Sequence, residues 1–185
     1  MQGKIYKLKD KANWVRRQTL EMIASARKGH IGGALSCTDI LVALYYGGIL
    51  RFDARLPSWD KRDRFILSKG HSAAALYAIL ADLGYFPLSE LLNYQKKGSI
   101  LAGHPHRKIP GIEADTGSLG HGLGIAAGLA LGAKMTKKDF MTFVLLGDGE
   151  CCEGSVWETA MFAARHKLNN LVGIIDKNGL CSTDF

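Results

Sequence analysis

The sequence lacks the segments that would mark a membrane protein, an exported protein or a nucleic-acid-binding protein. Its longest apolar run, Ile40–Leu50, is much shorter than the ~20 residues that a bilayer span requires. Residues 1–11 are charged and contain no apolar core, so we expect no signal peptide. Basic residues outnumber acidic ones by 24 to 17, but they are scattered singly or in pairs. We therefore expect neither a membrane nor a nucleic acid as a partner.

Cysteine and proline are also scarce, with 4 of each in 185 residues. The cysteines show no disulfide-type spacing, and two are adjacent: Cys37, Cys151, Cys152 and Cys181. Free thiols without an export signal indicate the reducing cytoplasm. Glycine, in contrast, is abundant, with 22 residues. An excess of glycine without an excess of proline favours close backbone packing over flexible linkers.

No repeat, low-complexity tract or linker divides the chain, so we expect one domain, residues 1–185. Ser36 and Asp39 form a variant capping box that places a helix start at Ser36. Hydrophobic periodicity predicts helices over residues 11–27, 36–46, 72–83, 88–97, 123–135 and 156–167. Short apolar runs predict strands over 64–68, 141–146 and 171–175, with an irregular stretch over 99–120.

The last third of the chain predicts a β-α-β unit. An apolar strand ends at the turn Gly147-Asp148-Gly149, a helix follows, and a second apolar strand comes after it. Strands that alternate with helices in this way indicate an α/β fold, with a mostly parallel sheet and helices on both faces.

Polar residues follow both strands of this unit. Asp148 comes after the first strand, and Asp176 and Asn178 come after the second. Because ligands of open parallel sheets bind beyond the carboxyl ends of the strands, we expect these side chains to lie close together. Gly149 offers an N–H group to a phosphate, and carboxylate and amide oxygens suit Mg²⁺. Each motif taken singly is also an ordinary turn, and that alternative stays open.

Five sequence blocks occur in an order typical of one enzyme family, and the resemblance around them runs from about residue 12 to 183. They are Lys28-Gly29-His30-x-Gly32, Ser68-Lys69-Gly70-His71-Ser72, Gly103-His104-Pro105 with Thr116–Gly120, Gly147-Asp148-Gly149 with Glu153-Gly154 and Trp157-Glu158, and Lys167-Leu168-x-Asn170-Leu171 with Asp176-x-Asn178. Together they resemble the transketolases, and best match the separately encoded N-terminal subunit of split transketolases.

The resemblance implies the thiamine diphosphate-binding fold, in its diphosphate-binding form, with thiamine diphosphate and Mg²⁺ as cofactors. It implies that Asp148, Asn178 and the backbone carbonyl of Leu180 hold Mg²⁺. It also implies that Gly149 and Asn178 contact the diphosphate.

Further cofactor contacts are implied for His71, Gly117 and Leu119, with the last two next to the cofactor rings. Glu153 and Glu158 fall where the family has acidic residues at the dimer interface between two cofactors. Both also suit the start of a helix, where carboxylates are favourable, so this reading stays open as well.

His30 and His104 are implied to face the substrate. Cleaving a ketose beside its carbonyl requires removal of a hydroxyl proton and the later return of a proton to an aldehyde oxygen. Imidazole titrates near neutral pH and can do both. The resemblance implies transfer of a two-carbon ketol (glycolaldehyde) unit from a ketose, expected to be a sugar phosphate, to an aldose acceptor. We assign no role to His106, His121 or His166.

The resemblance also implies a second polypeptide. The family places its pyrimidine-binding domain on a separate C-terminal subunit, and we expect the pair to dimerise as a dimer of heterodimers. Because Phe185 follows the metal loop so soon, we expect the diphosphate-binding domain to be incomplete at its C-terminus. His121 replaces a usual Gln, and Cys151-Cys152 is an unusual pair, but neither changes an expected metal ligand.

Other functions remain as alternatives. Deoxyxylulose-phosphate synthases and dehydrogenase E1 subunits share part of the motif set, and the chain could be a non-catalytic assembly subunit. Gly122-x-Gly124-x-x-Ala127 matches a relaxed dinucleotide-binding fingerprint, but a loop is expected where that fingerprint requires a strand. A zinc-binding module would use Cys151, Cys152 and Cys181, which lack Cys-x₂-Cys spacing.

Overall fold

A parallel three-stranded sheet forms the centre of the molecule, which we describe from a computed structural model for residues 2–181. Its strands lie in the order β1 (Arg64–Leu67), β2 (Thr142–Gly147) and β3 (Leu171–Asp176). Each strand begins and ends within one residue of its predicted bounds. Positions 182 and 183, the end of the motif resemblance, lie outside the described residues.

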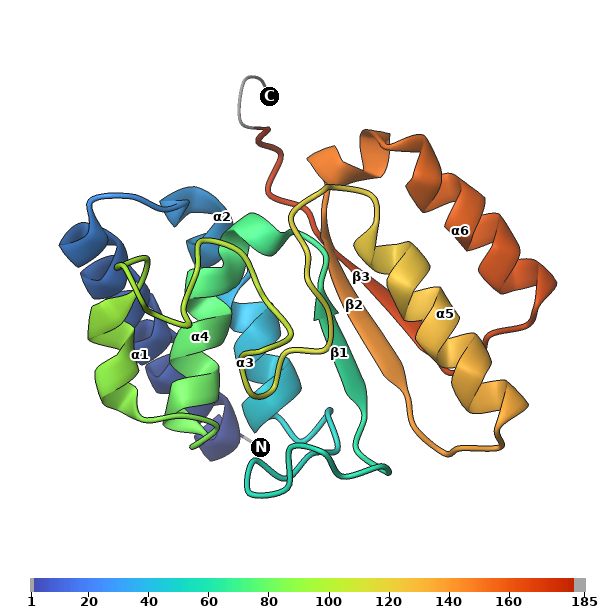
Figure 1. The fold of residues 1–185 in the computed structure, drawn as a ribbon, viewed down its shortest axis with the longest axis horizontal. Helices are drawn as coiled ribbons and strands as arrows, with labels where there is room; N and C mark the ends of the chain where they lie inside the picture. The colour runs from blue at the N-terminus through green and yellow to red at the C-terminus, as the bar shows by residue number, and fades with distance from the viewer. Residues whose placement is uncertain (1, 182–185) are drawn as a thin grey trace.

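Helices cover both faces of this sheet (Figure 1). One face carries α1 (Gln2–Ala26), α2 (Ile31–Ser36), α3 (Thr38–Tyr46) and α4 (Ala73–Asp82). The other carries α5 (Gly122–Met135) and α6 (Gly154–Arg165). The predicted α/β class, a parallel sheet between two helical layers, is confirmed.

Side chains alternate between these two layers, as the pleat of a strand requires. Phe65, Leu67 and Leu145 lie in the larger core with α1, α3 and α4. Ile66 and Val144 lie in a second core with α5 and α6. β1 and β2 are therefore apolar on both faces over residues 65–67 and 143–146, and a fully buried Leu or Ile side chain contributes about 1.5–3 kcal/mol.

Two helices show why their composition suits their places. In α4 every residue from Ala73 to Ala81 is buried, as expected of a helix that is apolar all round. Helix α5 is rich in Gly and Ala and lies very close to β1. A Cβ on Gly122 would fall 2.3 Å from the Ser68 hydroxyl oxygen, so only glycine permits this approach.

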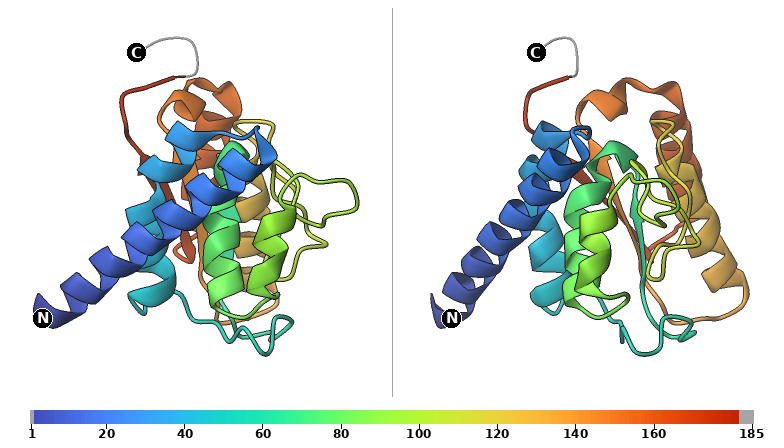
Figure 2. Two further views of the ribbon diagram at one scale, coloured as in Figure 1. Left: turned by 90° about the vertical axis from the view of Figure 1, so that its left-hand side faces the viewer. Right: turned by 60° about the vertical axis from the view of Figure 1, so that its left-hand side comes forward.

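Helix α1 is longer than predicted, because it begins at Gln2 rather than at Lys11. Its buried residues start only at Ala12, so the hydrophobic pattern could not indicate the exposed first turns. Figure 2 shows these turns extending past the other helices. Among the described residues, no helix is both long and apolar enough to cross a membrane.

The predicted capping box at Ser36 is wrong. Ser36 is the last residue of α2, and α3 begins at Thr38 after an N-cap, Cys37, whose side chain makes no capping bond. The Ser36 hydroxyl instead donates to Asp176, and Asp39 pairs with Arg16 of α1. Both side chains therefore bond to residues distant in sequence instead of capping the helix.

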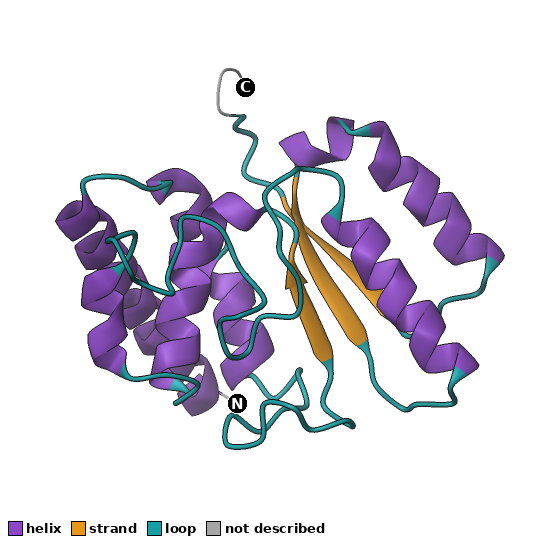
Figure 3. Cartoon of the chain, viewed as in Figure 1, coloured by secondary structure: helices purple, strands orange, loops and turns teal. Residues whose placement is uncertain are grey.

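The helix predicted over 88–97 is also wrong. Leu88–Asn93 forms a short 3₁₀ helix, η2, and the backbone turns extended at Tyr94. This turn buries Tyr94, whose ring meets that of Tyr77 edge to face with centroids 6.2 Å apart. A long loop, residues 94–121, then runs to α5 without helix or strand (Figure 3), as expected for 99–120.

Candidate functional site

The two polar loops of the β-α-β unit meet at the carboxyl edge of the sheet, as predicted. Asp148 follows β2, and its Oδ2 atom accepts a hydrogen bond from the Gly179 N–H group at 2.7 Å. The Asp148 N–H group in turn donates to the Asp176 carbonyl at 3.3 Å. The loop after β2 (residues 148–149) and the end of β3 with its following loop (residues 176–180) thus form one continuous surface, which we call the rim.

The Asp148 carboxylate is held by backbone donors. Burial by itself would raise its pKa, but the N–H groups of Gly179 and Gly149 outweigh burial and keep the pKa below the ordinary value. Asn178 lies next to it, with its amide oxygen accepting from the Leu180 N–H group at 2.8 Å. Asp148 is therefore ionised at neutral pH and available to a cation.

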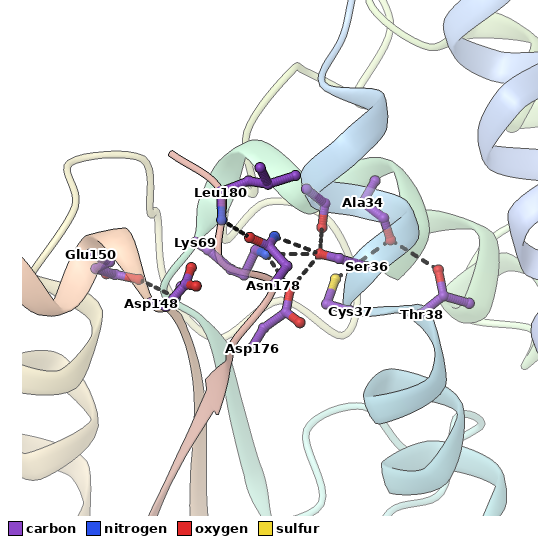
Figure 4. A network of polar contacts seen from close by, with 12 residues as sticks. Ala34, Ser36, Cys37, Thr38, Lys69, Asp148, Glu150, Asp176, Asn178 and Leu180 are labelled. Atoms are coloured by element: carbon purple, nitrogen blue, oxygen red, sulfur yellow. Dashed lines mark hydrogen bonds and ion pairs between the residues drawn. The ribbon is translucent and has the colours of Figure 1, made fainter. Parts of the chain in front are cut away.

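A buried ion pair supports this rim from below (Figure 4). Lys69, 2% exposed, donates from Nζ to Asp176 Oδ2 at 2.5 Å. Ser36 donates to the same oxygen at 2.5 Å and accepts from the Asn178 amide nitrogen at 3.3 Å. This network orients the Asn178 amide, because its nitrogen is committed to Ser36.

Three predicted histidines lie together beside the rim. His30 is the N-cap of α2, His71 lies in the short helix η1 (Gly70–Ser72) after β1, and His104 comes from the long loop. The His30 ring centroid lies 5.5 Å from that of His71 and 6.0 Å from that of His104. Segments far apart in sequence therefore present three imidazoles to one region.

Glycines allow this close grouping of the rings. A Cβ on Gly33 would lie 2.7 Å from the His71 ring. Gly117 has a φ of +150°, and a Cβ there would lie 2.9 Å from the His104 ring. A side chain at either position would displace a histidine, and Gly117 also needs a backbone conformation that L residues rarely adopt.

The cluster favours neutral imidazole. Burial, with help from Lys69 and the neighbouring histidines, lowers the pKa of His71 to about 4. Burial and His30 also lower the pKa of His104. At neutral pH both rings can accept a proton or a hydrogen bond, and His71 remains uncharged down to acidic pH.

The remaining predicted residues divide between two elements. Gly117 and Leu119 lie in the loop that Thr116 joins to β1 through a hydrogen bond from its hydroxyl to the Leu67 carbonyl, 2.7 Å long. Glu153 is the N-cap of α6 and Glu158 lies within that helix, both exposed. Glu153 and Glu158 therefore lie on a different element from the histidine cluster.

Sequence reasoning missed several residues of this region. The sequence predicts no role at the site for Ser36, Lys69 or Glu150, although each makes polar contacts there. Lys69 lay inside a recognised motif, so its place next to His71 was a usable signal. Ser36 and Glu150 gave none, because Asp176, the partner of Ser36, and Ser68 and Gly120, partners of Glu150, are distant in sequence.

The donor set suits a hard divalent cation. Asp148, Asn178 and the Leu180 carbonyl offer a carboxylate, an amide oxygen and a backbone oxygen, which are the ligands that Mg²⁺ takes alongside phosphate oxygens. Over residues 2–181, no group of three or more His, Cys, Asp and Glu could hold a metal ion. All four cysteines are free, and burial raises the pKa of Cys37 to about 11.

Comparisons with known proteins point to one enzyme family. A family model described as the transketolase, thiamine diphosphate binding domain matches residues 8–184. The chain is 47% identical over 180 residues to an apulose-4-phosphate transketolase subunit of Phocaeicola vulgatus, covering 97% of this chain and 63% of that relative. It is 42% identical over 172 residues to a 6-deoxy-6-sulfo-D-fructose transketolase subunit of Clostridium sp., covering 92% of this chain and 62% of that relative.

A solved structure is also similar. The transketolase of Campylobacter jejuni aligns with a TM-score of 0.90 and 34% sequence identity, covering 96% of this chain and 29% of that one. The chain thus spans less than two thirds of the length of the curated relatives it matches.

Proposed function

This chain belongs to the transketolase family, and we propose that it is the N-terminal, diphosphate-binding subunit of a split transketolase. Residues 1–185 would form one domain of this type, acting in the cytoplasm. The observation that carries the proposal is the meeting of His30, His71 and His104 at the carboxyl edge of the parallel sheet, the same edge at which Asp148 follows β2.

The rim is the proposed site for the charged end of the cofactor. Asp148, Asn178 and the Leu180 carbonyl would hold Mg²⁺, and Gly149 and Asn178 would contact the diphosphate. The ionised Asp148 supports this role, because a negatively charged carboxylate is a favourable ligand for a cation that also binds phosphate oxygens. When bound, thiamine diphosphate supplies the nucleophilic carbon and electron sink that ketol transfer needs.

The histidines are the proposed proton carriers and orienting groups. His30 and His104 would face the sugar, where a neutral imidazole accepts a hydroxyl proton and an imidazolium returns one to an aldehyde oxygen. The lowered pKa of His104 favours the accepting form. His71, neutral across the physiological range, would hydrogen-bond at the cofactor, with Gly117 and Leu119 lining the rings.

The proposed partner is a separate pyrimidine-domain chain, and two such pairs would form a heterotetramer. Two relatives are named as transketolase subunits, which supports a second polypeptide. Helix α6 supports self-association, because it exposes two large apolar side chains close to Glu158. They are Trp157 and Met161, which are 61% and 67% exposed. Large apolar side chains gathered on one exposed helix are typical of an interface.

The proposed reaction is transfer of a two-carbon ketol unit from a ketose phosphate to an aldose. The names of the relatives point to a transketolase rather than to a deoxyxylulose-phosphate synthase or a dehydrogenase subunit. The dinucleotide alternative loses support, since the segment before Gly122 is a loop and not a strand.

Ketol transfer with and without the partner tests this proposal. The purified full-length protein is mixed with Mg²⁺, thiamine diphosphate, a ketose phosphate donor and an aldose acceptor. We expect no turnover from this polypeptide by itself, and turnover once the pyrimidine-domain polypeptide is added. Turnover by the single polypeptide at the rate of the pair would contradict the split-site proposal.

A further inference from the structure

Glu150 is a buried carboxylate at the carboxyl edge of the sheet that the proposed function leaves without a role. It lies in the short 3₁₀ helix η3 (Gly149–Cys152), next to the Asp148 loop, and is 2% exposed. In the described part of the chain it belongs to no ion pair. A buried carboxylate without a cation needs several hydrogen bonds to offset its lost hydration.

Three donors converge on this side chain. Its Oε1 atom accepts from the Ser68 hydroxyl and from the Gly120 N–H group at 2.9 Å. Its Oε2 atom accepts from the Gly147 N–H group at 3.0 Å. Three donors on two oxygens match an ionised carboxylate, which only accepts hydrogen bonds and binds donors more strongly than a neutral group.

The three donors come from three different segments of the site. Ser68 follows β1, Gly147 ends β2 directly before Asp148 and Gly149, and Gly120 ends the loop that carries Gly117 and Leu119. In Figure 4, Glu150 lies beside Asp148. One side chain thus joins the proposed metal and diphosphate loop to the proposed ring-contacting loop.

The Gly120 end of that loop is fixed from two directions. Its N–H group donates to Glu150, and its carbonyl accepts from the Ser155 hydroxyl of α6 at 2.9 Å. A Cβ on Gly120 would lie 2.5 Å from the Ser155 hydroxyl oxygen, and its φ is +81°. The loop therefore has little room to shift while Glu150 keeps its contact.

We infer that Glu150 is a positioning residue, which sets the spacing between the loop that holds Mg²⁺ and diphosphate and the loop that contacts the cofactor rings. The inference rests on the proposed function, because it assigns Glu150 a task at the same cofactor site. Because its side chain is 2% exposed, Glu150 would act through the backbone of Gly147 and Gly120 rather than by touching the cofactor or the substrate.

Glu150→Gln is the sharpest test, because it keeps the shape of the side chain. A glutamine has one acceptor oxygen, so its NH₂ group must face either the Gly120 or the Gly147 N–H group, neither of which can turn away. The Ser68 hydroxyl can rotate to accept instead. One of the two loops is therefore released, whichever way the amide lies.

Titration calorimetry of the full-length protein with its partner measures the outcome, with Mg²⁺ and thiamine diphosphate as the titrant. We expect the Kd to rise about tenfold or more, while kcat at saturating cofactor stays within about threefold of the wild type. Glu21→Gln, the same change at an exposed site on α1, is the matched control and should leave the Kd unchanged.

Three results would overturn the inference. A Glu150→Gln variant with a lower melting temperature but the wild-type Kd would show a structural role alone. If the wild-type pair itself does not bind thiamine diphosphate, the proposed function fails and this inference fails with it. Should Glu150→Gln not fold, Ser68→Ala decides: removal of one donor should raise the Kd about threefold, and an unchanged Kd overturns the inference.

Discussion

The two ends of the central sheet differ in what their charged side chains bind. At the amino end, Glu113 pairs with Arg62 and with Arg64. Asp63, paired with Arg51, also accepts the Arg51 and Met141 N–H groups at 2.8 and 2.9 Å. These charges satisfy one another and leave nothing for a ligand.

At the carboxyl end the balance is different. Within the part of the chain that the structure describes, Asp148 is held only by backbone N–H groups, and the rings of the three histidines lie together. Lys69 and Asp176 are paired, but they lie beneath the rim. Charged side chains that pair with one another stabilise the fold, whereas a carboxylate held by backbone N–H groups alone remains available for binding.

Asp148→Ala should have the largest effect, and only at the carboxyl end. Without this carboxylate, Mg²⁺ loses a charged ligand next to the diphosphate, so binding of thiamine diphosphate should be abolished. The fold should remain, since Asp148 forms no ion pair among residues 2–181. Asp10→Ala, the same change at an exposed site, is the control. Calorimetry in saturating Mg²⁺ measures this, and wild-type affinity would refute the metal-ligand assignment.

Alanine at His30 or His104 should come next. Loss of general acid–base help at the substrate should reduce turnover about 10²–10⁴-fold, with little change in cofactor affinity. Steady-state kinetics and a cofactor titration on the same samples separate the two quantities. His166→Ala, at an exposed histidine beyond α6, is the control. Parallel losses of turnover and of cofactor binding would contradict the assignment to the substrate.

Glu113→Gln breaks the amino end instead. It leaves two largely buried guanidinium groups without their carboxylate, so the free energy of unfolding should fall by about 3 kcal/mol. Urea denaturation measures this fall. The cofactor Kd should not change at temperatures where the variant is folded, and a weakened Kd would show that the two ends are coupled.

His71 should give the smallest effect, visible in the pH dependence of stability. Its pKa is about 4 when folded and near 6.5 when unfolded, so the unfolded state binds the proton first as the pH falls. The free energy of unfolding should therefore decrease between pH 6.5 and 4. His71→Asn should flatten that slope, as measured by denaturation across this range, and an unchanged slope would show that another group causes it.

Local pattern was enough for most of the fold. The strands of the β-α-β unit, the apolar α4 and the small-residue α5 carry their own signals, because burial on one or on all sides dictates which residue types each can contain. The prediction that Asp148 and Asn178 lie together followed from the parallel arrangement alone. Local patterns gave wrong predictions where contacts with distant residues set the structure, as for the capping box at Ser36 and the helix expected over 88–97.

The site shows the same division. The residues with the required chemistry can be read from the chain, since glycine, histidine and aspartate stand in recognisable blocks. Their grouping cannot: it takes the folded molecule to bring His30, His71 and His104 into one region, to pair Lys69 with Asp176, and to let Glu150 join three segments. Such contacts depend on distances between segments remote in sequence, and these distances are set by how the helices pack on the sheet and not by any local preference of the chain.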